Sequence, residues 1–279
     1  MIKLCLPLVC ILLCGMTATR EDDFMKSSES MSKDSIQKHT LEIAGHKVDV
    51  WLPGQPPKGC ILLLPGWNFS RTDWCERSSM CTQALQRGFA LVMPEMGKSV
   101  YAEQLFPETR PDWRQYPTRP WLREQVIEEV RARFGLLKPG QNNFVVGLST
   151  GARGAALLCL DMPGFWKGAA LLSGDYDQTK MPSDNLMRGY YGSYQQFAER
   201  WKTVDNVIHR ILEWRTPVYI GHGRKDKVVP PAQSQHLCEV LRKVYPQLTV
   251  ECHFPLAGHD YTYWDSEVKP ILDFLESLL

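Results

Sequence analysis

A serine between two glycines is the strongest chemical signal in the sequence. The segment Gly-Leu-Ser-Thr-Gly at 147–151 follows the apolar run 144–146 and precedes an alanine-rich stretch that starts at Ala152. This order predicts a strand, a tight turn and a helix, which is the setting of a nucleophile elbow. The glycines remove side chains that would clash at a turn with strained dihedral angles. We therefore predict that Ser149 is a nucleophile.

A serine hydroxyl needs a general base, and the base needs an orienting carboxylate. After an elbow of this kind the acid comes first along the chain and the histidine second. His259 lies in a loop after the last apolar strand and before the final helix, and we predict that it is the base. His222, between two glycines at a strand end, is the alternative. We expect His253 to pack within a strand.

The predicted acid is Asp226, which follows the penultimate apolar strand at 218–220. Asp175 and Asp177, after the preceding strand, are the alternatives. An oxyanion intermediate also needs two backbone N–H groups aimed at its charge. We expect one from Thr150, directly after the nucleophile, and the other from Trp67, in the loop that follows the strand ending at 64.

The elements that must position these groups alternate along the chain. Two short segments around a Gly45 turn, 41–43 and 48–51, predict a strand pair at a sheet edge. Continuous apolar runs, which are typical of strands buried on both faces, follow at 60–64, 89–93, 144–147, 169–172, 218–220 and 248–254. Helical patterns lie between or after them at 121–134, 152–160, 231–245 and 268–279. The sequence predicts an α/β fold with a mostly parallel central sheet and helices on both faces.

One long segment interrupts this alternation after the strand that ends near Leu172. The stretch 173–216 is rich in glycine and aromatic residues, and its position after a strand end suits a lid or wall over the site. The candidates for substrate binding are Tyr101, Tyr190, Tyr191 and Trp201. Ordinary aromatic packing is the alternative role for each of them.

The N-terminus has the pattern of an export signal. Lys3 precedes an apolar run at 4–16, which is shorter than the ~20 residues of a membrane span, and small residues follow at 17–19. We predict a signal peptide at 1–19, a polar flexible linker at 20–38 and a single domain at 39–279. The mature protein is then periplasmic or secreted, with no stable membrane span. Lipid attachment at Cys14 is less favoured, because bulky Leu13 precedes it.

Six cysteines follow the linker, an even number that suggests disulfides in an exported chain. Six cysteines allow 15 pairings. The short polar loop favours Cys75 with Cys81, and a second pair, Cys238 with Cys252, would join a helix to the next strand. Cys60 and Cys159 lie in apolar runs and fit buried thiols. No Cys-x-x-Cys pair supports a metal site.

Composition excludes several classes of protein. The chain has 279 residues, 44% hydrophobic and 23% charged, with a net charge of +1, so it is a globular chain without the basic field of a nucleic-acid-binding protein. Four arginines within 110–123 could form a wall for an anionic or sugar-bearing substrate. We favour a solvated surface with salt bridges to Glu124, Glu128 and Glu129. The sequence leaves the oligomeric state open.

These residues together resemble the α/β-hydrolase superfamily, and within it the esterase group of esterase D, S-formylglutathione hydrolase and the mycolyltransferases. The resemblance covers about 60–279 and rests on the segments 92–95, 97–101, 147–154, 172–174, 223–226 and 258–264. It implies hydrolysis of a small-molecule carboxylic ester or thioester through an acyl-serine, without a cofactor. Acyl transfer with the same residues is an alternative, as is a non-catalytic binding protein that keeps the fold.

Overall fold

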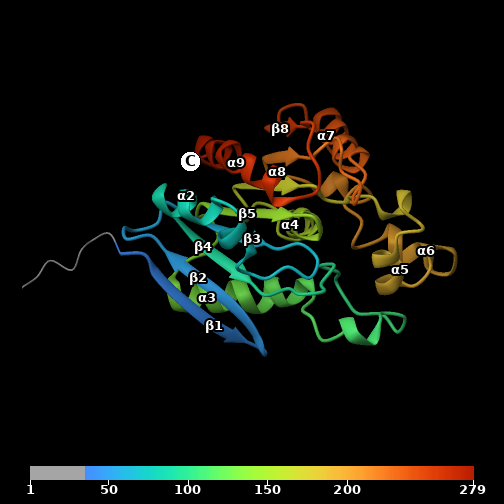
Figure 1. The fold of residues 1–279 in the computed structure, drawn as a ribbon, viewed down its shortest axis with the longest axis horizontal. Coiled ribbons are helices and arrows are strands. Elements are labelled where there is room, and N and C mark those ends of the chain that lie inside the picture. Colours follow the sequence, from blue (N-terminus) through green and yellow to red (C-terminus); the bar gives the residue numbers. More distant parts are fainter. Residues whose placement is uncertain (1–34) are drawn as a thin grey trace, which may run out of the picture. The chain divides into compact units, whose positions relative to one another are not determined.

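The computed structural model describes residues 35–279. The predicted signal peptide and most of the predicted linker lie outside this range. The first strand begins at Gln37, so regular structure starts two residues before the predicted domain boundary at 39. Figure 1 shows the arrangement of the elements along the chain.

An eight-stranded sheet forms the centre of the described chain, in the order β1-β2-β4-β3-β5-β6-β7-β8. The strands from β4 to β8 in this order pair in parallel, whereas β1 and β2 are antiparallel to their neighbours. The predicted edge hairpin is present, with positive φ angles at its turn residues Ala44 and Gly45. The strands are β1 Gln37–Ile43, β2 His46–Leu52, β3 Gly59–Leu64, β4 Phe89–Pro94, β5 Asn143–Leu148, β6 Gly168–Leu172, β7 Val218–Gly221 and β8 Val250–His253.

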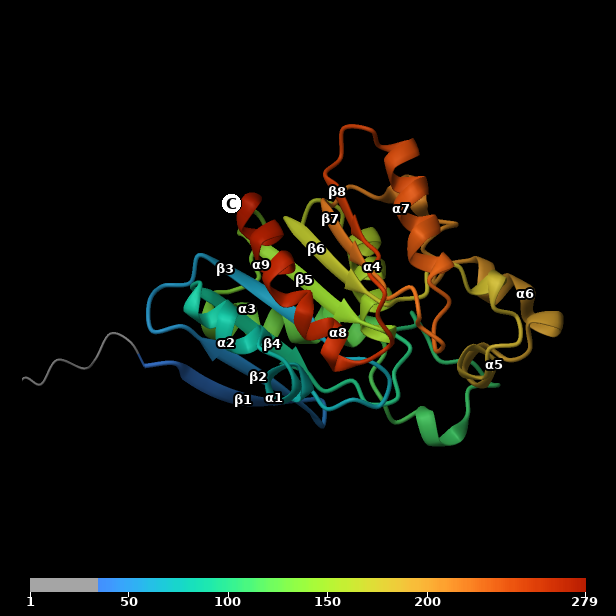
Figure 2. The same ribbon diagram turned by 45° about the horizontal axis from the view of Figure 1, so that its top comes forward.

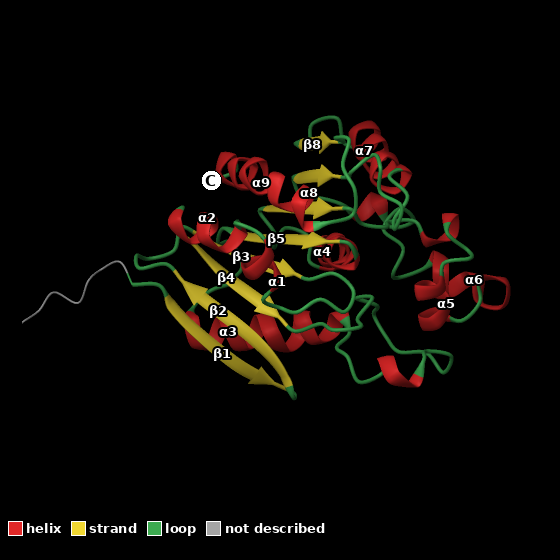
Figure 3. Ribbon diagram, in the orientation of Figure 1, coloured by secondary structure: helices red, strands yellow, loops and turns green. Residues whose placement is uncertain are grey.

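Helices cover both faces of the sheet (Figure 3). Apolar residues of α3, α4 and α7 pack in one core, and those of α1, α2, α8 and α9 pack in the other. The predicted α/β-hydrolase arrangement is confirmed. The helices are α1 Asp73–Arg77, α2 Met80–Gln86, α3 Ile127–Phe134, α4 Thr150–Asp161, α5 Asn185–Tyr191, α6 Tyr194–Lys202, α7 Ala232–Val244, α8 Tyr261–Ser266 and α9 Val268–Ser277.

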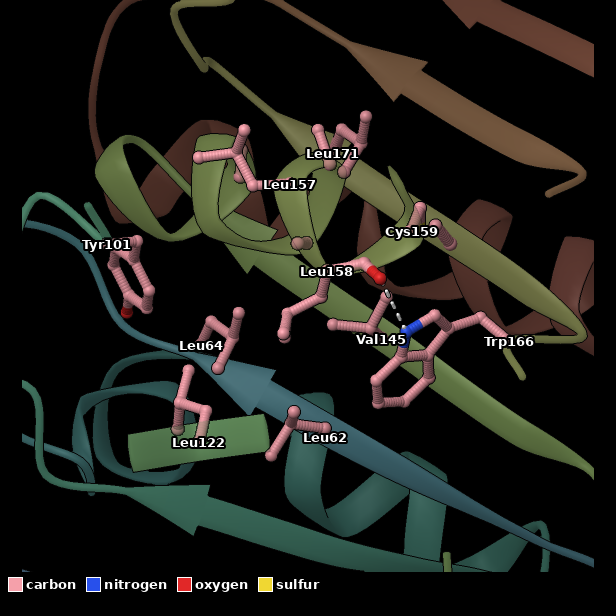
Figure 4. Close-up of a cluster of buried hydrophobic side chains, with 14 of the residues drawn as sticks. Leu62, Leu64, Tyr101, Leu122, Val145, Leu157, Leu158, Cys159, Trp166 and Leu171 are labelled. Atoms are coloured by element: carbon pink, nitrogen blue, oxygen red, sulfur yellow. Dashed lines mark hydrogen bonds between the residues drawn. The ribbon is translucent and has the colours of Figure 1, made fainter. Parts of the chain in front are cut away.

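Burial on both faces explains the continuous apolar runs. In β3, Leu62 and Leu64 enter one core while Ile61 and Leu63 enter the other, because successive strand side chains point to opposite faces. Figure 4 shows the first core, where Leu62 and Leu64 lie beside residues of α4 and β5. The Trp166 indole lies in this core and donates a hydrogen bond of 3.2 Å to the Leu158 carbonyl, also drawn in Figure 4.

Two predicted elements differ from the structure, one in its helix type and one in its length. The expected helix at 121–134 opens with a π-helix, Trp121–Val126, and only then continues as α3. The apolar spacing that predicts a helix is met by either winding, so the pattern could not separate them. The last strand covers only Val250–His253 rather than 248–254. It pairs with β7 alone at the sheet edge, and its alternating exposure reflects that position.

The segment after β6 lies beyond the carboxyl ends of the parallel strands, where α5 and α6 are seen in Figures 1 and 2. It has its own small apolar core, which it shares with the chain between β4 and α3. The buried members of this third core are Val100, Ala102, Trp113, Met187, Tyr190, Tyr191 and Trp201. The long excursion is therefore a packed structure rather than an open loop.

Both predicted disulfides are present. Cys75 is bonded to Cys81, and Cys238 in α7 is bonded to Cys252 in β8. Cys60 and Cys159 are free and buried, as expected for thiols in apolar runs. Burial raises the pKa of the Cys159 thiol to about 12, so this thiol stays protonated and unreactive near neutral pH.

Candidate active site

The turn between β5 and α4 has the geometry that the glycine spacing predicts. Ser149 has φ 53° and ψ −125°, a left-handed conformation that costs backbone strain in a residue other than glycine. A Cβ on Gly147 would lie 2.1 Å from the carbonyl oxygen of Gly151, and a Cβ on Gly151 would lie 2.4 Å from that of Leu64. Glycine is therefore required at both positions, and the strained turn raises the Ser149 side chain at the carboxyl end of β5.

His259 lies next to this serine. Its Nε2 atom is 3.1 Å from Ser149 Oγ, and its Nδ1 atom is 2.6 Å from Asp226 Oδ2. The loop that carries it is fixed by Asp260, whose carboxylate accepts a hydrogen bond from the Tyr263 amide at the start of α8. Trp264 packs edge-on against the imidazole, with 5.0 Å between ring centroids. The predicted base thus has a fixed position between the predicted nucleophile and the predicted acid.

Asp226 lies in the loop after β7 with both carboxylate oxygens engaged. Oδ1 accepts hydrogen bonds from the amides of Val228 and Val229, at 2.7 and 2.9 Å. Burial of the carboxyl group raises its pKa, but hydrogen bonds from His222, His259 and the Val229 amide outweigh this effect. The pKa of Asp226 is therefore well below its usual range, and the group is an anion at neutral pH.

The alternative candidates for the base and the acid make other contacts. His222 is fully buried on the far side of the acid, and its hydrogen-bond partners within 35–279 are Asp226, Val229 and Ser234 rather than Ser149. Asp175 accepts a hydrogen bond from Gln178 and lies 3.6 Å from Arg153. Asp177 caps a short 3₁₀ helix. Neither of these aspartates takes the place beside the imidazole of His259.

His253 is a correction to the expectation of strand packing. Its side chain is 53% exposed, and Nδ1 lies 2.8 Å from the Glu267 carboxylate. Alternation along an edge strand places every second residue outward, and His253 is one of them.

The two amides expected to bind an oxyanion come from the first turn of α4 and from the loop after β3. Thr150 is the first residue of α4, where helix geometry leaves the N–H without an intrahelical acceptor. Trp67 lies in the loop after β3. Among residues 35–279, neither amide donates a turn, loop or side-chain hydrogen bond. The Trp67 indole packs edge-on against Trp113, with ring centroids 4.7 Å apart, so this loop contacts the chain between β4 and α3.

The four aromatic residues expected to bind substrate are packed inside the protein instead. Their exposed fractions lie between 0% and 3%, for Tyr101, Tyr190, Tyr191 and Trp201. The Tyr101 hydroxyl donates to the Pro65 carbonyl at 2.7 Å, and the Trp201 indole donates to the Gly192 carbonyl at 3.2 Å. Figure 4 shows Tyr101 within the first core, near Leu64 and Leu122. Aromatic composition alone could not distinguish residues that pack in the interior from residues that line a substrate site.

A buried cation one turn after Ser149 was not among the predicted site residues. Arg153 on α4 is fully buried and donates hydrogen bonds to the Tyr191 hydroxyl and, at 3.0 Å, to the Met187 sulfur, both on α5. The Tyr191 hydroxyl in turn donates to Asp205 at 2.9 Å. These contacts fix the segment after β6 to the helix that carries Ser149. An arginine inside an otherwise apolar helix was the available sequence signal.

The arginine-rich segment 110–123 is only partly the solvated surface that we expected. Arg123 does pair with Glu124, at 3.0 Å. Arg119, in contrast, is fully buried and binds Asp161, Asp205, Glu103 and the Tyr101 carbonyl. Glu128 and Glu129 pair within α3 with other arginines. The prediction of a solvated surface is wrong at Arg119 because its partners come from segments distant in the chain.

Within 35–279, no group of three or more His, Cys, Asp or Glu side chains is arranged to hold a metal ion. No helix in that same range is both long and apolar enough to cross a bilayer.

Comparison with solved structures shows the same fold in other proteins. Fluorophosphonate-binding serine hydrolase F of Staphylococcus aureus has a TM-score of 0.70 at 18% identity, over 86% of this chain and 98% of that one. The S-formylglutathione hydrolase of Staphylococcus aureus has a TM-score of 0.70 at 18% identity, over 87% of this chain and 99% of that one. MPT51 of Mycobacterium tuberculosis has a TM-score of 0.64 at 17% identity, over 87% and 99%. At these identities the likeness concerns the fold.

The family comparison reaches further. A search of curated proteins gave no match. The model of the family described as "Putative esterase" matches residues 50–275, which span all the strands from the end of β2 to β8 and the Ser149 elbow. The predicted resemblance to the esterase group of α/β hydrolases is thereby confirmed. The chain belongs to the "Putative esterase" family, and it is an esterase.

Proposed function

We propose that the protein hydrolyses a carboxylic ester through an acyl-serine intermediate, with Ser149 as nucleophile, His259 as general base and Asp226 as orienting acid. The observation that carries the proposal is one continuous hydrogen-bonded chain, 3.1 Å from serine to imidazole and 2.6 Å from imidazole to carboxylate. Each link lies within the range expected for proton transfer between a nucleophile, its base and an orienting group.

The first half-reaction follows from this chain. Ser149 Oγ attacks the ester carbonyl carbon while its proton moves to His259 Nε2. Asp226 accepts the Nδ1–H hydrogen bond and stabilises the imidazolium that forms. The amides of Trp67 and Thr150 stabilise the negative oxygen of the tetrahedral intermediate, helped by the N-terminus of α4. Collapse breaks the bond to the leaving alcohol, which takes the proton from His259.

The second half-reaction regenerates the free enzyme. A water molecule gives a proton to His259 and attacks the acyl carbon, and the carboxylic acid leaves as Ser149 regains its proton. An alcohol in place of water would make the product an ester, so acyl transfer shares every residue of this mechanism. The proposed substrate is a small-molecule ester or thioester.

The proposed location is outside the cytoplasm, after removal of the leader at 1–19. Two disulfides within 35–279 support an oxidising compartment, because such bonds are rare in reducing ones.

Replacing Ser149 by alanine tests the mechanism with a chromogenic short-chain ester. We expect a loss of at least about 10⁴-fold in kcat, with a normal fold. The matched control is S183A, at an exposed serine distant in sequence from the elbow, which should keep its full rate. Unchanged hydrolysis by purified S149A would refute the assignment.

Two further assays separate the alternatives. A fluorophosphonate probe should label the wild-type protein and not S149A, whereas a non-catalytic binding protein would not be labelled at all. Adding an acceptor alcohol to the ester assay would reveal transfer as a new ester product.

A further inference from the structure

A second imidazole binds the carboxylate that we assign as the triad acid. His222 Nε2 lies 3.0 Å from Asp226 Oδ2, the same oxygen that faces His259 Nδ1. The His222 side chain is fully buried and stands at the carboxyl end of β7, four residues before the aspartate. Its other ring nitrogen, Nδ1, is 2.7 Å from the hydroxyl of Ser234 in α7. The carboxylate therefore has an imidazole on each side, one directly after β7 and one in the loop before α8, and the first of them is held by α7.

The contacts of His222 fix its tautomer. Nε2 faces two acceptors, the Asp226 carboxylate and the Val229 carbonyl at 3.1 Å, so this nitrogen must carry a proton. In the neutral ring Nδ1 is then an acceptor, and the Ser234 hydroxyl is placed to donate to it. Ser234 thus stabilises the tautomer of His222 that donates to the acid.

The hydrogen bonds to the two oxygens of Asp226 show what His222 contributes. The two backbone amides hold Oδ1, whereas Oδ2 has only the two imidazoles as partners among residues 35–279. Without His222, Oδ2 would be held by His259 alone, and the carboxylate would be less restricted in its rotation about the Cβ–Cγ bond. A hydrogen bond to an anion also spreads its charge, which moderates its attraction for the imidazolium of His259.

We propose that His222, oriented by Ser234, is a positioning residue that fixes the Asp226 carboxylate and sets the basicity of His259. This inference rests on the proposed function, because it acts through the same Asp226–His259 pair. His222 touches neither Ser149 nor the space above it and is not a catalytic residue.

Two phenols lie near this pair and stay neutral near neutral pH, and the carboxyl groups of Asp260 and Glu267 beside them are the same in every variant below. Tyr176, in the loop after β6, and Tyr263, on α8, face the cluster, and burial raises the pKa of both phenols far above the usual value. The exposed cations Arg224, Lys225 and Lys227 of the acid loop are the same in every variant below. Shifts measured between variants therefore report on the two imidazoles and the carboxylate.

Two substitutions at position 222 separate hydrogen bonding from packing. H222L puts an apolar side chain of similar bulk in place of the imidazole and so removes the hydrogen-bond donor. H222Q has an amide N–H that can reach Asp226. We expect H222L to lower kcat/KM by about 10- to 100-fold, the value of one hydrogen bond to a charged group, and H222Q to recover most of that loss. S234A should have a smaller effect, about two- to fivefold, because only the tautomer of His222 is loosened.

The pH profile of kcat/KM is the readout that packing alone would not move. Its acidic limb reports protonation of the base in the free enzyme. With one donor lost, the carboxylate attracts the His259 imidazolium more strongly, so the limb should move to higher pH by about 0.5 to 1 unit in H222L. In H222Q it should stay near the wild-type position, and in S234A it should move in the same direction as in H222L.

H253L is the matched control, because the exposed His253 imidazole pairs with buried Glu267 and not with Asp226 or His259, so both rate and profile should stay unchanged. An unchanged limb in H222L, or equal losses in H222L and H222Q, would overturn the positioning role. If H222L does not fold, S234A carries the test, and an unshifted limb there overturns it. Active S149A would instead refute the proposed function, whereas inactive S149A beside an unaffected H222L would refute this inference alone.

Discussion

Replacing the acid by its amide, D226N, is the sharpest test of the site because the structure determines what the amide must do. The two backbone N–H groups that bind Oδ1 need an acceptor, so they fix the carbonyl oxygen of the asparagine at that place. The NH₂ group then occupies the position of Oδ2. It faces His259 Nδ1 at 2.6 Å and can only donate to it.

This donation reverses the tautomer of the base. With Nδ1 as acceptor, the proton of neutral His259 moves to Nε2, which faces Ser149 Oγ at 3.1 Å. A protonated Nε2 cannot accept the proton of the serine. The expected loss is about 10⁴-fold in kcat, which corresponds to about 5.5 kcal/mol of transition-state stabilisation. The fold should persist because the two Oδ1 bonds remain, although the bonds of both imidazoles to the charged Oδ2 are lost, each worth about 1.5–3 kcal/mol.

The assay is ester hydrolysis at neutral pH, with the unfolding midpoint measured on the same preparation. A folded D226N enzyme that retains more than about a tenth of the wild-type kcat would refute the assignment of the acid and with it the tautomer argument.

Three more outcomes follow from the described contacts. Opening the Cys238–Cys252 bond with a double serine substitution should lower the unfolding free energy by about 3 kcal/mol, measured by urea denaturation, since the bond closes a loop with a sequence separation of 14. The pKa of Asp226 in the folded protein lies below the unfolded value of about 3.9, so its ionisation stabilises the fold above about pH 4. This contribution is lost as the pH falls further. The difference in unfolding free energy between wild type and D226N should therefore narrow from about pH 6 to about pH 3. R119M should lower the unfolding free energy by about 3 kcal/mol, because the buried carboxylates of Asp161 and Asp205 each lose a charged partner. R110M, at a 58% exposed arginine, should change the unfolding free energy by less than about 0.5 kcal/mol, and equal unfolding midpoints for the two variants would contradict the buried network.

The order of strands and helices could be predicted because burial leaves a local trace. Parallel strands enclosed on both faces must be apolar throughout, so the runs that became β3 to β7 were visible without any partner being known. The elbow was visible for a similar reason, since close backbone approach at Gly147 and Gly151 excludes every larger residue. The serine, acid and histidine were then ordered by the strands they follow.

What the sequence could not give is the set of contacts between distant segments. Arg119 meets Asp161 and Asp205 only in the folded chain, and no local pattern marks it as buried. His222 was weighed as a base because it stands at a strand end, but which side of the acid it occupies depends on packing against α7. Likewise, aromatic residues such as Tyr191 carry no local mark that separates a binding wall from a packed interior.

The buried Arg153 makes the region beyond β6 dependent on the nucleophile helix. An exchange of that region for the corresponding segment of another esterase would strip the guanidinium of Tyr191 and Met187 and leave a cation enclosed in the protein. Chimeras of this scaffold should therefore carry α4 and the following segment together.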